Sequence, residues 1–157
     1  MGVIKPSLTV TANASSATTD AGPLSIALSL STTDSLDITK VESRIIDVDG
    51  THGLLLDASS FCAGGSATAE AGTDGAFVYL KNVTAVGSGR NIMIGSANSN
   101  QSGNVDPDSP SATRLFTLQP QEWAWFPWDC TYDIYEDANG TSTNALEYWV
   151  FVRTGTA

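Results

Sequence analysis

The sequence predicts an all-β protein with a single β-sandwich or jelly-roll-like domain, short strands and long Gly/Ser/Asn loops. Short apolar or aromatic segments recur at intervals of roughly 8–12 residues, with turn-forming residues between them. No segment is predicted to form a long helix. With 157 residues, 41% of them apolar, the chain is long enough for one hydrophobic core. We expect residues 1–20 to form an N-terminal arm or edge strand, and residues 21–157 to form the sandwich domain.

The first third of the chain contains three strand signals. The Ser/Thr/Ala-rich N-terminus holds one possible strand at Leu8–Thr11. The apolar residues Leu24, Ile26, Leu28 and Leu30 then alternate with small residues, which predicts a half-buried strand. Residues 38–48 have apolar residues at helical spacing, but they are β-branched and lead into Asp49-Gly50, a hairpin signal. We therefore predict two strands joined by this turn, the second at Leu54–Leu56.

The middle of the chain alternates between loops and short strands. Residues 57–75 are rich in Gly, Ala, Ser and Thr, which predicts a loop. Phe77–Leu80 and Ile92–Ile94 are predicted strands because aromatic and β-branched residues fit a pleated surface. Residues 96–111 form the longest irregular stretch, and loops of this length are usually functional or mobile.

The last third is predicted to be mostly strand. Leu115–Leu118, Thr131–Tyr135 and Leu146–Val152 have strand composition or alternation, and Asp137–Gly140 has the composition of a turn.

The chain has a formal net charge of −10, from seven Lys and Arg against 17 Asp and Glu. The cations are scattered, so neither nucleic acid nor an anionic membrane is an expected partner. No apolar run reaches the ~20 residues that span a bilayer, and the N-terminus lacks the apolar core of a signal peptide, so we expect synthesis in the cytoplasm. The acidic residues are expected to lie in turns, at Asp47/Asp49, Asp106/Asp108 and Asp133/Glu136/Asp137.

The residues that most often carry chemistry are sparse. His52, the single histidine, is predicted to be a loop residue, because a catalytic triad needs a neighbouring nucleophile and acid. The acids at Asp47 and Asp49 do not continue into a calcium loop and fit a turn better. For Cys62 and Cys130 we expect unpaired, partly buried thiols, with a single bridge as the alternative. We therefore predict no enzymatic activity, no cofactor and no metal site.

An aromatic cluster is the most distinctive feature of the sequence. In a strand, Trp123 and Trp125 share one face with Pro127, while Phe126 and Trp128 occupy the other. Three interpretations are open: core packing that also closes a sandwich end, a subunit interface, or a platform that stacks on sugar rings. The candidate interface residues are Trp123, Trp125, Phe126, Trp128 and Trp149.

Three short motifs in residues 75–157 resemble small virion proteins of tailed bacteriophages. A predicted strand ends in Lys81-Asn82 before a glycine turn, the segment Leu118-Gln119-Pro120-Gln121-Glu122 leads into the aromatic cluster, and Glu147-Tyr148-Trp149 lies in the last strand. The resemblance implies a capsid decoration (cement) protein, a β-sandwich homotrimer on the virion. Such a protein is expected to bind the major capsid protein at capsomer junctions on the outer head surface and to stabilise the head. The resemblance implies no catalytic residues.

Two other functions remain open. The same features suit a phage tail, head-fibre or head–tail connector protein. A carbohydrate-binding β-sandwich would use Trp123, Trp125 or Trp128 as its platform.

Overall fold

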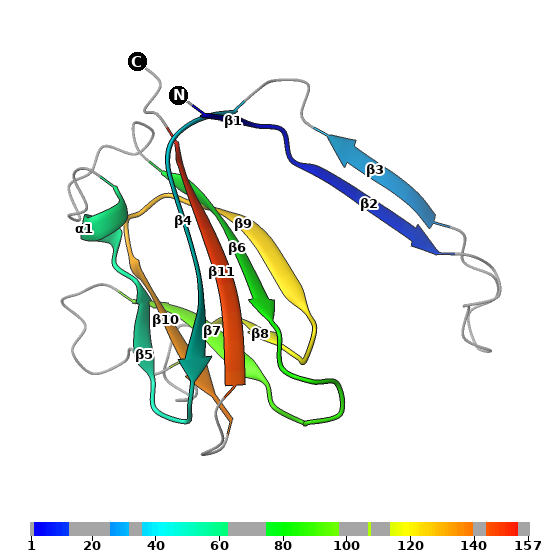
Figure 1. Cartoon of the computed structure of the whole chain (residues 1–157), viewed down its shortest axis with the longest axis vertical. Helices are drawn as coiled ribbons and strands as arrows, with labels where there is room; N and C mark the ends of the chain where they lie inside the picture. Colours follow the sequence, from blue (N-terminus) through cyan, green and yellow to red (C-terminus); the bar gives the residue numbers. More distant parts are fainter. Residues whose placement is uncertain are drawn as a thin grey trace. The chain divides into compact units, whose positions relative to one another are not determined.

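The computed structural model describes residues 2–12, 26–31, 36–62, 75–97, 107, 114–139 and 144–153. The chain divides into two compact units, Met1–Asp37 and Ile38–Ala157. The strands of both units are shown in Figure 1. The predicted all-β class is confirmed, because strands make up most of the described residues and each sheet is antiparallel.

The smaller unit contains β1 (Gly2–Ile4), β2 (Ser7–Ala12) and β3 (Ile26–Ser31). β2 and β3 pair as an antiparallel ladder in which Leu8 lies opposite Leu30. The two strands predicted near the N-terminus are therefore partners, although Leu24 lies outside the described residues.

The larger unit is a sandwich of two antiparallel sheets. In one sheet the strands follow the order β4-β11-β6-β9, and in the other the order is β5-β10-β7-β8. Figure 1 shows β4, β11 and β6 in front of β10 and β7. The bounds are β4 Leu36–Val48, β5 Gly53–Leu56, β6 Ala76–Asn82, β7 Ile92–Ala97, β8 Arg114–Leu118, β9 Trp123–Trp128, β10 Asp133–Ala138 and β11 Asn144–Arg153.

The core lies between the two sheets and is filled by alternate residues of each strand. Along β6 and β11, buried residues alternate with more exposed ones over the whole length of the strand. Val78, Leu80 and Val150 from one sheet pack with Ile94 and Ile134 from the other, and each is at most 2% exposed. This alternation leaves every second side chain of β6 and β11 on the outer face.

The Asp49-Gly50 turn joins two strands as predicted, but these strands do not pair with each other. β4 pairs with β11, with Val48 opposite Asn144, whereas β5 pairs with β10. The turn therefore carries the chain from one sheet to the other. The Asp49 side chain accepts a hydrogen bond from the Thr51 N–H (2.9 Å), as expected for a turn-forming aspartate.

A short helix, α1 (Ala58–Phe61), lies in the segment that we predicted to be a loop. Asp57 caps it by accepting hydrogen bonds from the Ser59 N–H and from the hydroxyls of Ser59 and Ser60. These two hydroxyl bonds are the main reason that the pKa of Asp57 is lowered. The helix has four residues, too few for an apolar period to reveal it. Among the described residues, no helix is long and apolar enough to cross a membrane.

Two other predicted boundaries differ from the structure. β10 extends to Ala138, so Asp137 and Ala138 belong to a strand rather than to the predicted turn. The predicted irregular stretch at 96–111 begins with the last two residues of β7, and apart from Pro107 its remainder lies outside the described residues.

Our expectation of two unpaired thiols is wrong, because Cys62 and Cys130 form a disulfide. Their Cα atoms lie 6.2 Å apart, and both residues are buried. Cys62 is the C-cap residue of α1, and Cys130 lies in the connection between β9 and β10. The two positions are 68 residues apart in sequence, so their spacing gave no sign that the fold brings them together.

Candidate functional site

The outer face of the β4-β11-β6-β9 sheet carries the most distinctive surface of the larger unit. Three consecutive rows of outward-facing residues cross this sheet. Each row contains one residue from each of the four strands, as the strand register pairs them. We call these twelve residues the aromatic face: Val41, Phe151, Phe77 and Pro127 in the first row, Ser43, Trp149, Tyr79 and Trp125 in the second, and Ile45, Glu147, Lys81 and Trp123 in the third.

The rings of the aromatic face are stacked against one another. Phe77 stacks on Trp125 with ring centroids 5.5 Å apart and planes 11° apart, and Tyr79 packs against Trp123 at 6.4 Å. Phe151 joins the group, because its ring lies 5.5 Å from Trp125. These diagonal and same-face contacts are the kind that stabilise sheets. These contacts cover part of each ring, and the exposed remainder of Trp123 and Trp149 is available for contacts beyond the sheet.

Polar contacts help to fix the rings. The Trp149 indole N–H donates to the Glu147 carboxylate (3.1 Å), and the Arg153 guanidinium lies over the Phe77 ring, 5.2 Å from its centroid. Burial raises the pKa of Tyr79, and the charge of Glu147 raises it further. The rings joined by these contacts are restricted, so less side-chain entropy is lost when something covers them.

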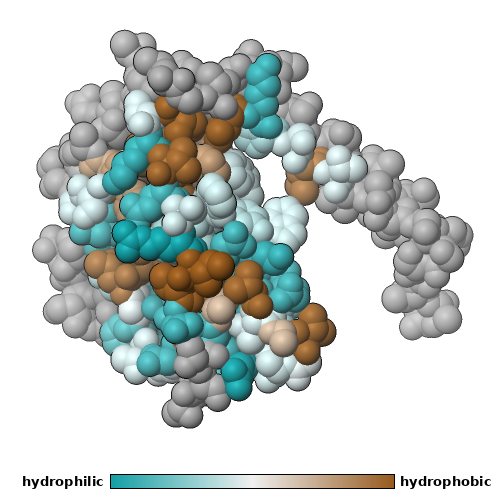
Figure 2. Space-filling view, viewed as in Figure 1, coloured by the Kyte–Doolittle hydropathy of each residue, from teal (hydrophilic) through white to brown (hydrophobic). Residues whose placement is uncertain are grey.

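The aromatic face is open to solvent. Trp123 is 50% exposed, Trp149 38%, Val41 51% and Ile45 68%. Figure 2 shows hydrophobic residues gathered in brown patches between pale and teal ones in this view. Exposed apolar and aromatic side chains gathered on one face in this way are a recognised sign of an interaction site.

The five interface candidates from the sequence are divided between the two faces of the sheet. Trp123, Trp125 and Trp149 lie on the aromatic face, as the alternation predicted for the first two. Phe126 and Trp128 point inward: Trp128 is 4% exposed and its indole N–H donates to the Tyr132 carbonyl. Phe126 packs against the core and edge-on against Phe116. These two residues therefore serve the core of the sandwich.

Sequence reasoning missed most of the other residues of the aromatic face. A signal was present, because Phe77-Val78-Tyr79-Leu80 is apolar at four successive positions, and such a strand presents apolar residues on both of its faces. Val41 and Ile45 of β4 belong to residues 38–48, whose helical spacing of apolar residues does not indicate an exposed sheet face.

Two of the motifs that carried the virion resemblance meet at one corner of the sandwich. Asn82, which is fully buried, donates from its amide to the carbonyls of Arg90 and Leu118, and its side-chain oxygen accepts from the Thr84 N–H. The Glu122 carboxylate accepts from the Gln119 N–H (2.8 Å) and so closes the turn between β8 and β9. Both motifs therefore have structural roles, tying the end of β6 to the end of β8.

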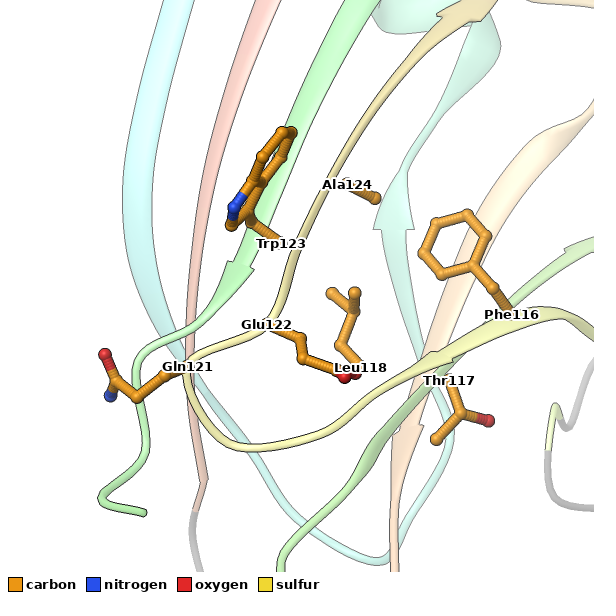
Figure 3. A pocket seen from close by; sticks show the side chains of 7 residues that line it. All are labelled: Phe116, Thr117, Leu118, Gln121, Glu122, Trp123 and Ala124. Atoms are coloured by element: carbon orange, nitrogen blue, oxygen red, sulfur yellow. The ribbon is translucent and has the colours of Figure 1, made fainter. Parts of the chain in front are cut away.

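A shallow pocket of about 510 Å³ lies at the same corner. Figure 3 shows its lining side chains, which come from β8, β9 and the turn between them, with the Trp123 ring pointing away from the others. Its polar side chains are already used within the protein: Glu122 caps the turn, and Gln121 donates to the Thr84 carbonyl. The pocket thus offers a small molecule few polar partners that are not already engaged.

Four acids predicted in turns lie instead in strands: Asp47 in β4, and Asp133, Glu136 and Asp137 in β10. Of these, Glu136 and Asp137 are buried. Glu136 is 8% exposed and Asp137 is 4% exposed. Burial, together with the nearby charges of Asp137 and Asp49, raises the pKa of Glu136 to about 7. Its Oε2 atom is buried without a hydrogen-bond partner among the described residues.

Neither of these acids forms part of a recognisable catalytic or metal-binding group. Within the described ranges, no cluster of three or more His, Cys, Asp or Glu could hold a metal ion. His52 is exposed in the short connection between β4 and β5. Asp106 and Asp108 lie outside the described residues.

Comparisons with known proteins give a similarity in fold alone. No protein-family model matches the sequence, and no curated protein matches it. Among solved structures, the chain is similar to a chain of the Bacillus endospore appendages, which form a novel family of disulfide-linked pili. The TM-score is 0.50 and the identity 12%, and the match covers 83% of this chain and 98% of that one. At this identity the match shows that the two chains share a fold.

Proposed function

We propose that this chain is a non-catalytic structural subunit of an assembly on the outside of a virus particle or cell. The observation that carries the proposal is the aromatic face, a mostly uncharged surface of stacked rings on one sheet of the sandwich. Interfaces are enriched in Trp, Tyr and Phe and depleted of charge at their centres, and this face has that composition.

The specific form that we propose is a capsid decoration protein of a tailed bacteriophage. The support is the resemblance of residues 75–157 to small virion proteins. In this role the chain would act as a homo-oligomer on the outer head surface, against the major capsid protein at capsomer junctions. A protein that binds the assembled shell and not its separate parts stabilises the shell by mass action.

A second candidate is a subunit of a fibre or appendage, which includes a phage tail or head fibre. The similarity in fold to a pilus subunit favours it. The Cys62–Cys130 disulfide suits both candidates, because disulfides persist in oxidising surroundings outside the cytoplasm. The bridge would then form or become permanent after the protein leaves the cytoplasm in which it is made.

A carbohydrate-binding role has less support from the geometry. Sugar rings stack on the flat faces of aromatic side chains. Here Trp125 already packs against Phe77 and Phe151, and Trp123 packs against Tyr79. Trp128, the third tryptophan of that interpretation, is buried.

Gold labelling in the electron microscope tests the proposal. An antibody against the purified chain is applied to virus particles and intact cells from a culture that carries the gene. Label on heads supports decoration, label on tails or filaments supports the second candidate, and label confined to the cytoplasm of sectioned cells would contradict both.

A further inference from the structure

The two charges of the aromatic face are placed in a way that points to its partner. Lys81 on β6 and Glu147 on β11 lie directly opposite each other in the register, at the same end of the face. The other ten residues of the three rows are uncharged. A third charge, the Arg153 guanidinium, lies over the Phe77 ring at the opposite end of the face. The Glu147 carboxylate already accepts a hydrogen bond from the Trp149 indole N–H. A partner that also places a positive group against Glu147 and a negative group against Lys81 would compensate both charges when the face is covered.

A second copy of the same face supplies both groups. When two copies meet face to face about a two-fold axis that runs parallel to the strands, between β11 and β6, β11 of each copy lies over β6 of the other. Glu147 then lies over the partner's Lys81, and Lys81 lies over the partner's Glu147. The same operation places Trp149 over the partner's Tyr79, so the apolar centre is self-complementary as well.

The alternative two-fold axis within the face lacks this match. An axis perpendicular to the strands, through the second row, places β11 over the partner's β11 with the row order reversed. Glu147 would then lie over the partner's Phe151, leaving a carboxylate against an apolar ring.

We propose that the chain forms an isologous dimer through its aromatic face, with the two-fold axis parallel to the strands between β11 and β6. This inference rests on the proposed role of the face as a contact surface. Aligned sheets pack with their strands about 30° apart, so the residues of β11 and β6, which are nearest the axis, remain opposite each other.

The size of the face sets the expected strength of the dimer. Four strands about 4.8 Å apart and rows about 7 Å apart give a face on the order of 400 Å². Standard interfaces bury about 800 Å² on each partner. We therefore expect a reversible dimer with a dissociation constant in the micromolar range, which many copies on one assembly would reinforce.

Charge reversal in the full-length chain tests the proposal. Lys81→Glu and Glu147→Lys each place like charges against each other twice in the dimer, so each variant alone should associate about 100-fold more weakly than the unaltered protein. In an equimolar mixture of the two, every charge again meets its opposite, so a heterodimer should form. Light scattering and sedimentation over about 1–100 µM measure the mass and the dissociation constant in each case, because at 100 µM alone a micromolar dimer weakened 100-fold would still be about half associated.

The matched control is Lys5→Glu, the same charge reversal outside the aromatic face, which should leave the mass unchanged. Thermal unfolding of each variant shows that it is folded. The proposal is overturned if the unaltered protein is a monomer or a trimer, if either reversal leaves the dimer intact, or if the mixture stays monomeric. If the antibody labels the surface of particles but the purified protein is a monomer in solution, the dimer is rejected and the proposed function is not.

Discussion

Glu136 makes the stability of the protein depend on pH in a direction that is unusual for a carboxylate. Its pKa is raised from the usual 4.5 to about 7, first by burial and then by the charges of Asp137 and Asp49. The folded protein therefore holds this proton more tightly than the unfolded chain does. The contribution of protonated Glu136 to the stability of the folded protein is complete below about pH 4.5 and is lost as the pH rises to about 7.

The magnitude follows from the size of the shift. Each pH unit across this window changes the free energy of unfolding by about 1.4 kcal/mol, so the whole window is worth about 3 kcal/mol. Glu136→Gln replaces the protonated acid with a neutral group of the same shape. The variant should match the unaltered protein near pH 4.5 and exceed it by about 3 kcal/mol near pH 8.

Urea unfolding followed by tryptophan fluorescence, at several values between about pH 4.5 and about pH 8, measures this difference. Contributions that the two proteins share cancel when their free energies are subtracted. Parallel pH profiles for the two proteins would refute the reasoning, because they would mean that Glu136 does not change its proton affinity on folding.

Three further predictions concern covalent, polar and steric contacts. The double substitution Cys62→Ala and Cys130→Ala should lower the free energy of unfolding by about 4 kcal/mol. A reductant should destabilise the unaltered protein but not this variant. If the reductant does not change the stability of the unaltered protein, the prediction is wrong. Asn82→Ala should lower the free energy of unfolding, measured with urea, by about 3 kcal/mol. The control Asn139→Ala breaks similar hydrogen bonds at an exposed site and should lower it by about 1 kcal/mol. Equal losses of stability would argue against a special role for Asn82. Gly53→Ala should lower the free energy of unfolding by about 2 kcal/mol, because the added methyl group would overlap the Glu136 carboxylate. The same substitution should have no such effect in a Glu136→Ala background. A loss of stability that persists there would have another cause.

Strand positions were predictable from the sequence because alternation is a local property. The segments at Phe77–Leu80, Leu115–Leu118 and Leu146–Val152 all lie within strands of the structure. Strand partners were not predictable, because pairing depends on distant residues. β4 pairs with β11, about a hundred residues further along the chain, and no local pattern indicates this.

The candidate site was predictable only in part for a similar reason. Alternation correctly separated Trp123 and Trp125 from Phe126 and Trp128, but it does not say which side faces the core. That choice is made by the second sheet, which covers Trp128 and leaves Trp123 exposed. The buried positions of Glu136 and Asp137 were missed because acids near a predicted turn are ordinarily exposed.

The Cys62–Cys130 bridge encloses β6, β7, β8 and β9 in one covalent loop. If a subunit is stretched through its two ends, tension crosses the bridge and bypasses every residue inside this loop. The fully extended chain is then about 240 Å shorter than that of the reduced protein, at roughly 3.5 Å for each of the 68 residues. In an assembly exposed to shear, the bridge would therefore limit how far a partly unfolded subunit can extend. The residues between Cys62 and Cys130 would carry no tension.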